Sequence, residues 1–448
     1  MQQEDQVNMG KHARRIRWRR WIAVALAVLV LVLVLHCLRP TAEEQLAAFD
    51  AARAVPDDDN AALIYAELLR GEKVPVSALW TQLAPFMESI QHPVSWLESR
   101  ELMKEVAELE LPEGLLDPNG ESLTLWEPWT SATCPELRRW LDHHSDRIDR
   151  LLEAAQKPAC YFPLRPEPND MGLFDVPLGT LGQCVALLRR AANNDMGEGN
   201  VAAGLKKYQA VTSIGRHLSK QPAKMPLIIG IPIEGVGLQH LAQFIATGPA
   251  TERHLDALAI DGSNLENQWD TLSEDVSRVR NILARAVKDH RRLDLRIYEA
   301  YRRIRYHEDG WVGKSRTRDL YQRVLCQRRA HHILIELRRF KNRAGHWPDQ
   351  IDEIASSVVP LALIDPQNGG AYVYRRTEDG FRLYSTGPNG RDENGQRQAG
   401  GPDDWPLWPT YSVLAGQRPK KSAAGRSRRM KQLNPVPSLP PLNQTMRC

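Results

Sequence analysis

One apolar run near the N-terminus constrains this chain more than any other feature. Residues 21–38 contain no charged side chain, and at about 1.5 Å per helical residue they cover roughly 27 Å, close to the thickness of a bilayer core. Basic residues precede the run, and Glu43 and Glu44 follow it. The positive-inside rule therefore predicts a cytoplasmic N-terminus and places the rest of the chain outside the cytoplasm.

Processed N-termini are the alternatives to a retained anchor. A cleaved signal peptide would have a shorter apolar region ending at a small-x-small site, whereas this run ends in His36-Cys37-Leu38. Lipid attachment at Cys37 would need a small preceding residue, and the residues after Arg14-Arg15 do not match a twin-arginine signal. We expect a single-pass signal anchor at residues 21–38 in a bacterial inner membrane, with residues 1–20 cytoplasmic.

The rest of the chain is long enough for two or three structural units. The whole chain has 448 residues, which exceeds the usual size of one hydrophobic core. Its hydrophobic fraction of 42% and charged fraction of 25% are those of an ordinary globular protein. The net charge of +4 is too small to imply a polyanionic partner for the whole molecule. We predict a folded, mainly α ectodomain, either a bundle or a short solenoid.

The cysteines beyond the anchor give little support for a disulfide framework. They are odd in number and lack metal-type CxxC spacing: Cys134, Cys160, Cys184, Cys326 and Cys448. Residues 135–155 have the pattern of one helix, which would separate Cys134 from Cys160 by about 30 Å, far beyond the roughly 7 Å limit between bridged Cα atoms. We predict that these two cysteines stay unbridged unless that helix breaks.

Two helical regions follow the anchor. Residues 39–177 combine helices with a Pro- and Trp-rich stretch of unpredicted fold. Residues 178–345 contain two apolar series at helical spacing on either side of the turn 193–200, which predicts an antiparallel helix pair. Residues 226–246 are apolar but contain glycines and Pro232, so a kinked, buried helix is expected there rather than a second membrane span.

Residues 196–211, MGEGNVAAGLKKYQAV, resemble the turn and second helix of a tetratricopeptide-like unit. Gly199-Asn200 lies at the turn, and Ala203, Tyr208 and Ala210 stand where such a unit has its small and aromatic packing residues. Units of this type stack into grooved solenoids that bind peptides. Since no second copy occurs at the proper period, a plain helical bundle is the alternative.

Arginines are concentrated in residues 264–340, and two interpretations are open. A basic stripe interleaved with Leu293, Ile297, Tyr301 and Ile304 on one helical face would suit a nucleic acid. Nearby acidic residues and a location outside the cytoplasm favour a solvated or salt-bridged helix face instead. We expect no nucleic-acid partner.

Residues 346–412 are predicted to form a small antiparallel β-module. Tyr372 and Tyr374 alternate before Asp379-Gly380, and Phe381 and Leu383 alternate after it, which is typical of a β-hairpin. After this module, residues 413–448 contain basic residues, no acidic residue and the segment PVPSLPPL. They are predicted to be a disordered, basic, Pro-rich tail.

Four segments in and just before this module resemble the C-terminal part of major pseudopilins of type II secretion systems: LRRFKNRAGHWP, Asp365-Pro366, residues 372–374 and LYSTGPNGRD. The resemblance implies a small sheet packed on a long helix, with calcium in the last loop. Its implied oxygen ligands are Asp392, Asn394, Asp403 and Asp404. A simple polar turn is the alternative for these residues. The apolar run lacks the glutamate of a pseudopilin, so incorporation into a pilus is not expected.

No catalytic or cofactor-binding constellation is assigned. Adjacent residues on a helix point about 100° apart, so neither His143-His144 nor His331-His332 makes a tight metal site alone. No GxSxG, HExxH, phosphate-loop or dinucleotide fingerprint occurs. The layout resembles a bacterial family of single-pass envelope proteins of unknown function. We expect a non-enzymatic scaffold that binds an envelope protein or peptide; an envelope-polymer hydrolase with a structural calcium loop is the alternative.

Overall fold

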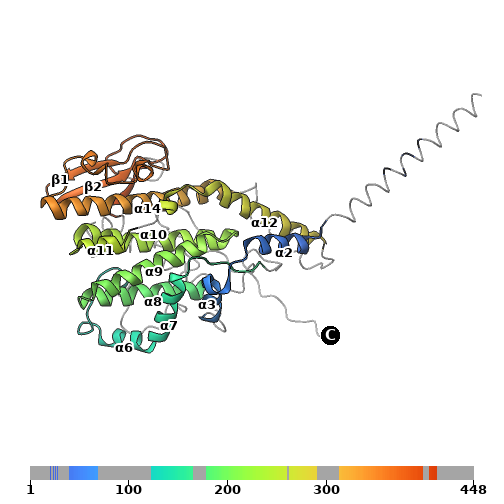
Figure 1. Cartoon of the computed structure of the whole chain (residues 1–448), viewed down its shortest axis with the longest axis horizontal. Helices are drawn as coiled ribbons and strands as arrows, with labels where there is room; N and C mark the ends of the chain where they lie inside the picture. The colour runs from blue at the N-terminus through green and yellow to red at the C-terminus, as the bar shows by residue number, and fades with distance from the viewer. Residues whose placement is uncertain are drawn as a thin grey trace, which may run out of the picture.

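Figure 1 shows the computed structural model, which describes residues 21, 24, 26, 28, 40–68, 123–164, 178–259, 262–289, 312–396 and 403–410. The predicted cytoplasmic segment 1–20, most of the anchor and the tail 413–448 lie outside the described residues. Four positions of the anchor are described, and each is helical and more than half exposed: Trp21, Val24, Leu26 and Val28. In the described residues the chain is mostly helical with a three-stranded antiparallel sheet, as predicted.

Four shorter helices come first along the described chain. They are α2 (Ala42–Arg53), α3 (Ala61–Leu68), α6 (Pro135–His143) and α7 (Ser145–Gln156). Helix α2 starts with a capping box, because Thr41 Oγ1 accepts from the Glu44 backbone nitrogen at 3.1 Å while the Glu44 carboxylate accepts from the Thr41 nitrogen at 2.7 Å. These reciprocal bonds fix where the chain enters the folded body.

The single helix predicted over residues 135–155 is wrong. The chain breaks at His144 into α6 and α7, because α6 packs on α8 (Leu178–Gly197) whereas α7 packs mainly on α3 and α9 (Val201–Ser219). Despite this break, Cys134 and Cys160 are free thiols, as are Cys184 and Cys326. The prediction of an unbridged pair rested on an unbroken helix, so the break removes its stated reason although both thiols are free.

The centre of the body consists of α8, α9 and α10 (Lys224–Thr247), which pack side by side (Figure 1). The predicted pair around the turn is confirmed as α8 and α9. Gly215 lets α9 approach α10 closely, since a Cβ there would lie 2.2 Å from the Glu234 backbone nitrogen. Among the described residues, Pro226–Thr247 is long and apolar enough to cross a membrane, but 89% of that window is buried in the protein. The expected buried helix is confirmed.

Three further helices, α11 (Glu252–Ala257), α12 (Trp269–Asp289) and α14 (Val312–Ala344), complete the helical body. Arginines of α14 connect this helix to other segments through hydrogen bonds to backbone carbonyl oxygens. Arg329 donates to the carbonyl oxygens of Leu265 and Ile364, and Arg338 donates to the Gly248 carbonyl oxygen at the end of α10. The apolar positions of the predicted basic stripe, residues 293–304, lie outside the described residues.

The β-module rests on α14. Strands β1 (Val373–Thr377), β2 (Gly380–Ser385) and β3 (Trp405–Trp408) form an antiparallel sheet in that order, and the hairpin register pairs Thr377 with Gly380. The hairpin predicted from Asp379-Gly380 is confirmed. Apolar residues of the sheet and of α14 share one buried cluster, so the sheet lies against the long helix (Figure 1).

Candidate cation site in the β-module

The loop between β2 and β3 brings three carboxylates together. Gly387, Gly390 and Gly395 adopt positive φ angles of 65°, 66° and 72°, a conformation that L-residues with a Cβ rarely adopt. Gly387 also leaves room for the loop, because a Cβ at this position would lie 2.6 Å from Asp403 Oδ1. These turns place Glu393 next to the residues that lead into β3.

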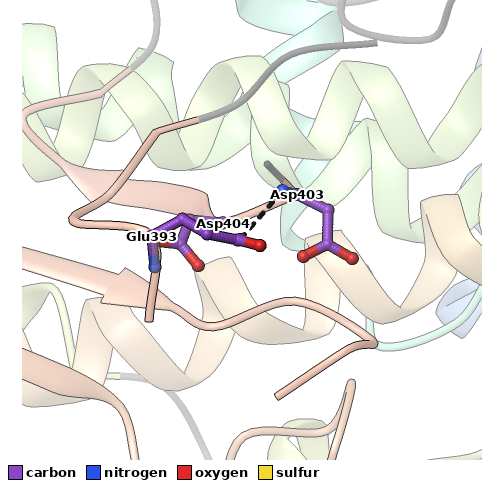
Figure 2. Close-up of side chains that lie close together, drawn as sticks. All are labelled: Glu393, Asp403 and Asp404. Carbon is purple, nitrogen blue, oxygen red and sulfur yellow. Dashed lines mark hydrogen bonds between the residues drawn. The ribbon is translucent and has the colours of Figure 1, made fainter. Parts of the chain in front are cut away.

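Glu393, Asp403 and Asp404 form the candidate cation site, which Figure 2 shows in close-up. One oxygen from each carboxylate lies within 4.8 Å of the others. The dashed line in Figure 2 marks the bond from the Asp403 backbone nitrogen to Glu393 Oε2, 3.1 Å long. Carboxylate oxygens at this spacing could hold a metal ion.

Asp404 is the most constrained member of the cluster. Its side chain is fully buried, and its Oδ2 accepts from the backbone nitrogens of Glu393 at 2.9 Å and Gly395 at 2.7 Å. Its Oδ1 is buried without any hydrogen-bond partner, and the same is true of Asp403 Oδ1. A buried polar atom without a partner is destabilising, so both oxygens are positions at which a hydrogen-bond donor or a cation would stabilise the fold.

The pKa values express this excess of negative charge. Burial, with the nearby charges of Glu393 and Asp392, raises the pKa of Asp404 to about 6. Burial and the charge of Glu393 likewise raise the pKa of Asp403. Desolvation alone would raise the pKa of Glu393 too, but hydrogen bonds from the Asp403 backbone and the Asn389 side chain lower it. Glu393 is therefore ionised at neutral pH beside two acids that resist ionisation.

Arg323 of α14 is the basic side chain whose charge acts on Asp403, yet it does not pair with the cluster. Its guanidinium lies 4.8 Å from the centroid of the Trp405 ring and forms a 2.6 Å ion pair with Asp319. Within the described part of the chain, no lysine or arginine nitrogen forms an ion pair with the three carboxylates. Among the described residues, the site is thus a concentration of negative charge without an ion-paired counter-charge.

The four predicted ligands separate into two groups. Asp403 and Asp404 belong to the cluster. Asp392 and Asn394 instead accept hydrogen bonds from Arg375 of β1, and Asp392 Oδ1 also accepts from the Tyr384 hydroxyl at 2.9 Å. Arg375 already neutralises Asp392, so two of the four predicted ligands belong to the cluster and two point away from it. Sequence reasoning missed Glu393.

The histidine pairs do not form a metal centre. His331 is buried and its Nε2 lies 3.0 Å from the Leu258 carbonyl oxygen, while His332 Nε2 accepts from the Val359 backbone nitrogen at 3.2 Å. His143 is exposed and contacts His144 edge-on. Among the described residues, the acidic cluster is the one group of three or more potential metal ligands that meets the spacing.

Comparisons of the whole chain with family models, with curated proteins and with solved structures gave no match. The chemistry of the site follows from its own residues. All its ligands are oxygens, with no imidazole or thiolate among them, which suits a hard cation rather than zinc or copper.

Proposed function

We propose that this protein is a membrane-anchored scaffold of the bacterial envelope, and that calcium closes the last loop of its β-module. The observation that carries the proposal is the fully buried Asp404, whose Oδ1 has no partner and which lies against two further carboxylates. A divalent cation supplies the missing positive charge. The loop would then be ordered when the ion is bound.

Calcium fits the ligand set better than magnesium does. Calcium accepts six to eight oxygens in flexible arrangements, including backbone carbonyl oxygens, whereas magnesium requires near-octahedral geometry and keeps several waters. Here two ligands are adjacent in sequence and the third comes from a turn ten residues earlier. Such a set is compact and irregular, which favours the larger and more adaptable ion.

The role proposed for the ion is structural. Asp404 is fully buried, and by accepting hydrogen bonds from the Glu393 and Gly395 backbone nitrogens it connects the middle of the loop to its end before β3. A catalytic site would instead need an open position for a substrate. We infer that the ordered loop is one surface through which the β-module binds an envelope protein outside the cytoplasm.

The anchor is part of the same proposal. Residues 21–38 supply an apolar segment of spanning length, and its four described residues are exposed rather than packed on the body. Helix α2 begins at Ala42, only a few residues after this run ends. An anchor so placed would hold the helical body close to the outer side of the inner membrane.

Thermal unfolding of the full-length protein in detergent, with EDTA or with calcium, tests the ion. Calcium should raise the Tm of the wild type, since a ligand at 100 times its Kd stabilises the native state by about 2.7 kcal/mol. Asp404→Asn should abolish the shift. Glu378→Gln removes an exposed charge from the same module and should keep it. An equal shift in all three proteins, or none in the wild type, would contradict the calcium site.

A further inference from the structure

Helix α8 contains two consecutive arginines that are buried without an acidic partner. The exposed fractions of Arg189 and Arg190 are 1% and 7%. In the described residues neither guanidinium forms an ion pair with a carboxylate. Buried charges in folded proteins are normally paired, because desolvating an ion is unfavourable by several kcal/mol even after relaxation.

Arg189 is held entirely by neutral groups. Its Nε donates to His240 Nε2 at 3.3 Å and its Nη2 donates to the Leu125 carbonyl oxygen at 3.0 Å. The Trp126 ring centroid lies 4.2 Å from its central carbon. Burial lowers the pKa of His240 well below its usual value, so that imidazole is neutral and accepts. These contacts fix the arginine but leave its charge uncompensated.

Arg190 has even fewer partners. Its guanidinium lies 6.0 Å from the centroid of the Trp140 ring on α6, and its Nε is buried without a hydrogen-bond partner. Burial lowers the pKa of Arg190 to about 10, so the side chain remains charged at neutral pH. A guanidinium offers five N–H donors in a planar fork. In the described structure, those of Arg190 donate to no protein acceptor.

We propose that Arg190 binds a phosphate-type oxyanion between α8 and α6, with Arg189 behind it contributing positive charge. The two helices pack against each other, and the Trp140 ring centroid lies 6.0 Å from the Arg190 guanidinium. The guanidinium fork matches two oxygens of a phosphate group, and a doubly charged anion balances the two unpaired arginines. The ligand is either free phosphate or a phosphate monoester.

This site is independent of the proposed calcium site, since it lies in the helical body and involves none of the loop carboxylates. Phosphate binding is measured by calorimetry and by the Tm shift of the full-length protein in detergent. The probes are inorganic phosphate, glycerol phosphate, acetate and chloride at matched ionic strength. Comparing the first two separates free phosphate from a monoester. Acetate and chloride test whether the site requires a doubly charged oxyanion.

Arg190→Gln is the decisive variant, and Arg139→Gln is its control. Arg139 lies on α6 next to Trp140, and its side chain is 78% exposed. We expect phosphate or its monoester to raise the Tm of the wild type and of the control. Arg190→Gln should lose the shift and bind at least about tenfold more weakly, because it loses a charge-assisted pair.

Three results would overturn the site: no phosphate effect in the wild type, an equal effect in Arg190→Gln, or equal shifts with acetate or chloride. If Arg190→Gln does not fold, Arg190→Lys decides, since it keeps the charge and loses the planar fork. Weaker phosphate binding by Arg190→Lys than by the wild type supports the guanidinium contact. Equal binding by the two proteins overturns that contact.

Discussion

Among the fully buried carboxylates of the described residues, Glu234 in α10 and Asp404 before β3 have opposite electrostatic surroundings. Arg328 donates to Glu234 through Nε and Nη2, both at 2.7 Å, and Arg216 donates to it at 3.2 Å. Burial alone would raise the pKa of Glu234, but these two guanidinium groups lower it. Asp404 receives only backbone N–H groups, and its pKa rises to about 6.

The difference shows that burial alone does not decide the state of a carboxylate. The helical body supplies its own cations to Glu234 from α9 and α14, so that ion pair is complete within the protein. The described residues of the β-module supply no such cation to Asp404. Arg189 and Arg190 on α8 are the reverse case, because within the described residues neither guanidinium has a carboxylate partner. Glu234 therefore needs no partner from outside the protein, whereas Asp404 and the two arginines of α8 are the buried charges at which we propose ligands.

Breaking the balanced pair should have the largest effect. Arg328→Met leaves Glu234 buried with Arg216 as its remaining partner, and loss of one partner from a buried ion pair destabilises a protein by about 3–5 kcal/mol. The midpoint of urea unfolding, followed by circular dichroism of the full-length protein, measures the change. The double variant Glu234→Leu/Arg328→Met should recover part of the loss, since the Glu234 carboxylate and the Arg328 guanidinium are then both removed.

The matched control is Arg376→Met, which breaks the exposed pair between Arg376 and Asp349 on the β-module. Exposed ion pairs contribute about 0–1 kcal/mol, so this variant should unfold close to the wild type. If Arg328→Met were as mild as the control, Glu234 would not depend on its cations. The contrast between the two carboxylates would then fail.

The close packing around Glu234 provides a second, smaller test. Gly215→Ala would place a Cβ 2.2 Å from the Glu234 backbone nitrogen, forcing α9 and α10 apart. Overpacking of this kind destabilises by about 1–3 kcal/mol, and it should also weaken the ion pair of Arg216 with Glu234. The measurement is the urea midpoint against Gly262→Ala, where a Cβ meets no atom within 4 Å. Equal midpoints would show that the helices adjust freely.

Much of the fold was predictable because local patterns and tertiary packing agree. The turn before Val201 and the hairpin at Asp379-Gly380 each contain turn-forming residues that can be recognised in the sequence. The break at His144 was not predictable, since no proline or glycine marks it. It arises because α6 and α7 pack on different helices, and tertiary contacts then override a continuous helical pattern.

The site was predictable in part for a similar reason. A strand or helix fixes side-chain direction by its period, but a loop does not, so Asp392, Glu393 and Asn394 could not be assigned to opposite sides from sequence. In the structure the Glu393 carboxylate lies close to those of Asp403 and Asp404, whereas Asp392 accepts a hydrogen bond from Arg375. The buried arginines of α8 also escaped prediction, because residues around Trp126, distant in sequence, help to cover them.

The pH dependence of Asp404 gives the smallest effect and the sharpest test of its missing cation. Its folded pKa of about 6 lies above its ordinary value of 3.8, so the native state without metal favours the protonated acid. That stability is fully present below about pH 4 and is lost as the pH rises through about 6. In EDTA the Tm of the wild type should therefore fall over this window relative to Asp404→Asn. Calcium should cancel the fall in Tm above pH 6 and bind more weakly below it, because a proton then competes for Asp404.

Parallel profiles of the two proteins in EDTA, unchanged by calcium, would mean that Asp404 is already neutralised by the protein itself, and the contrast with Glu234 would disappear.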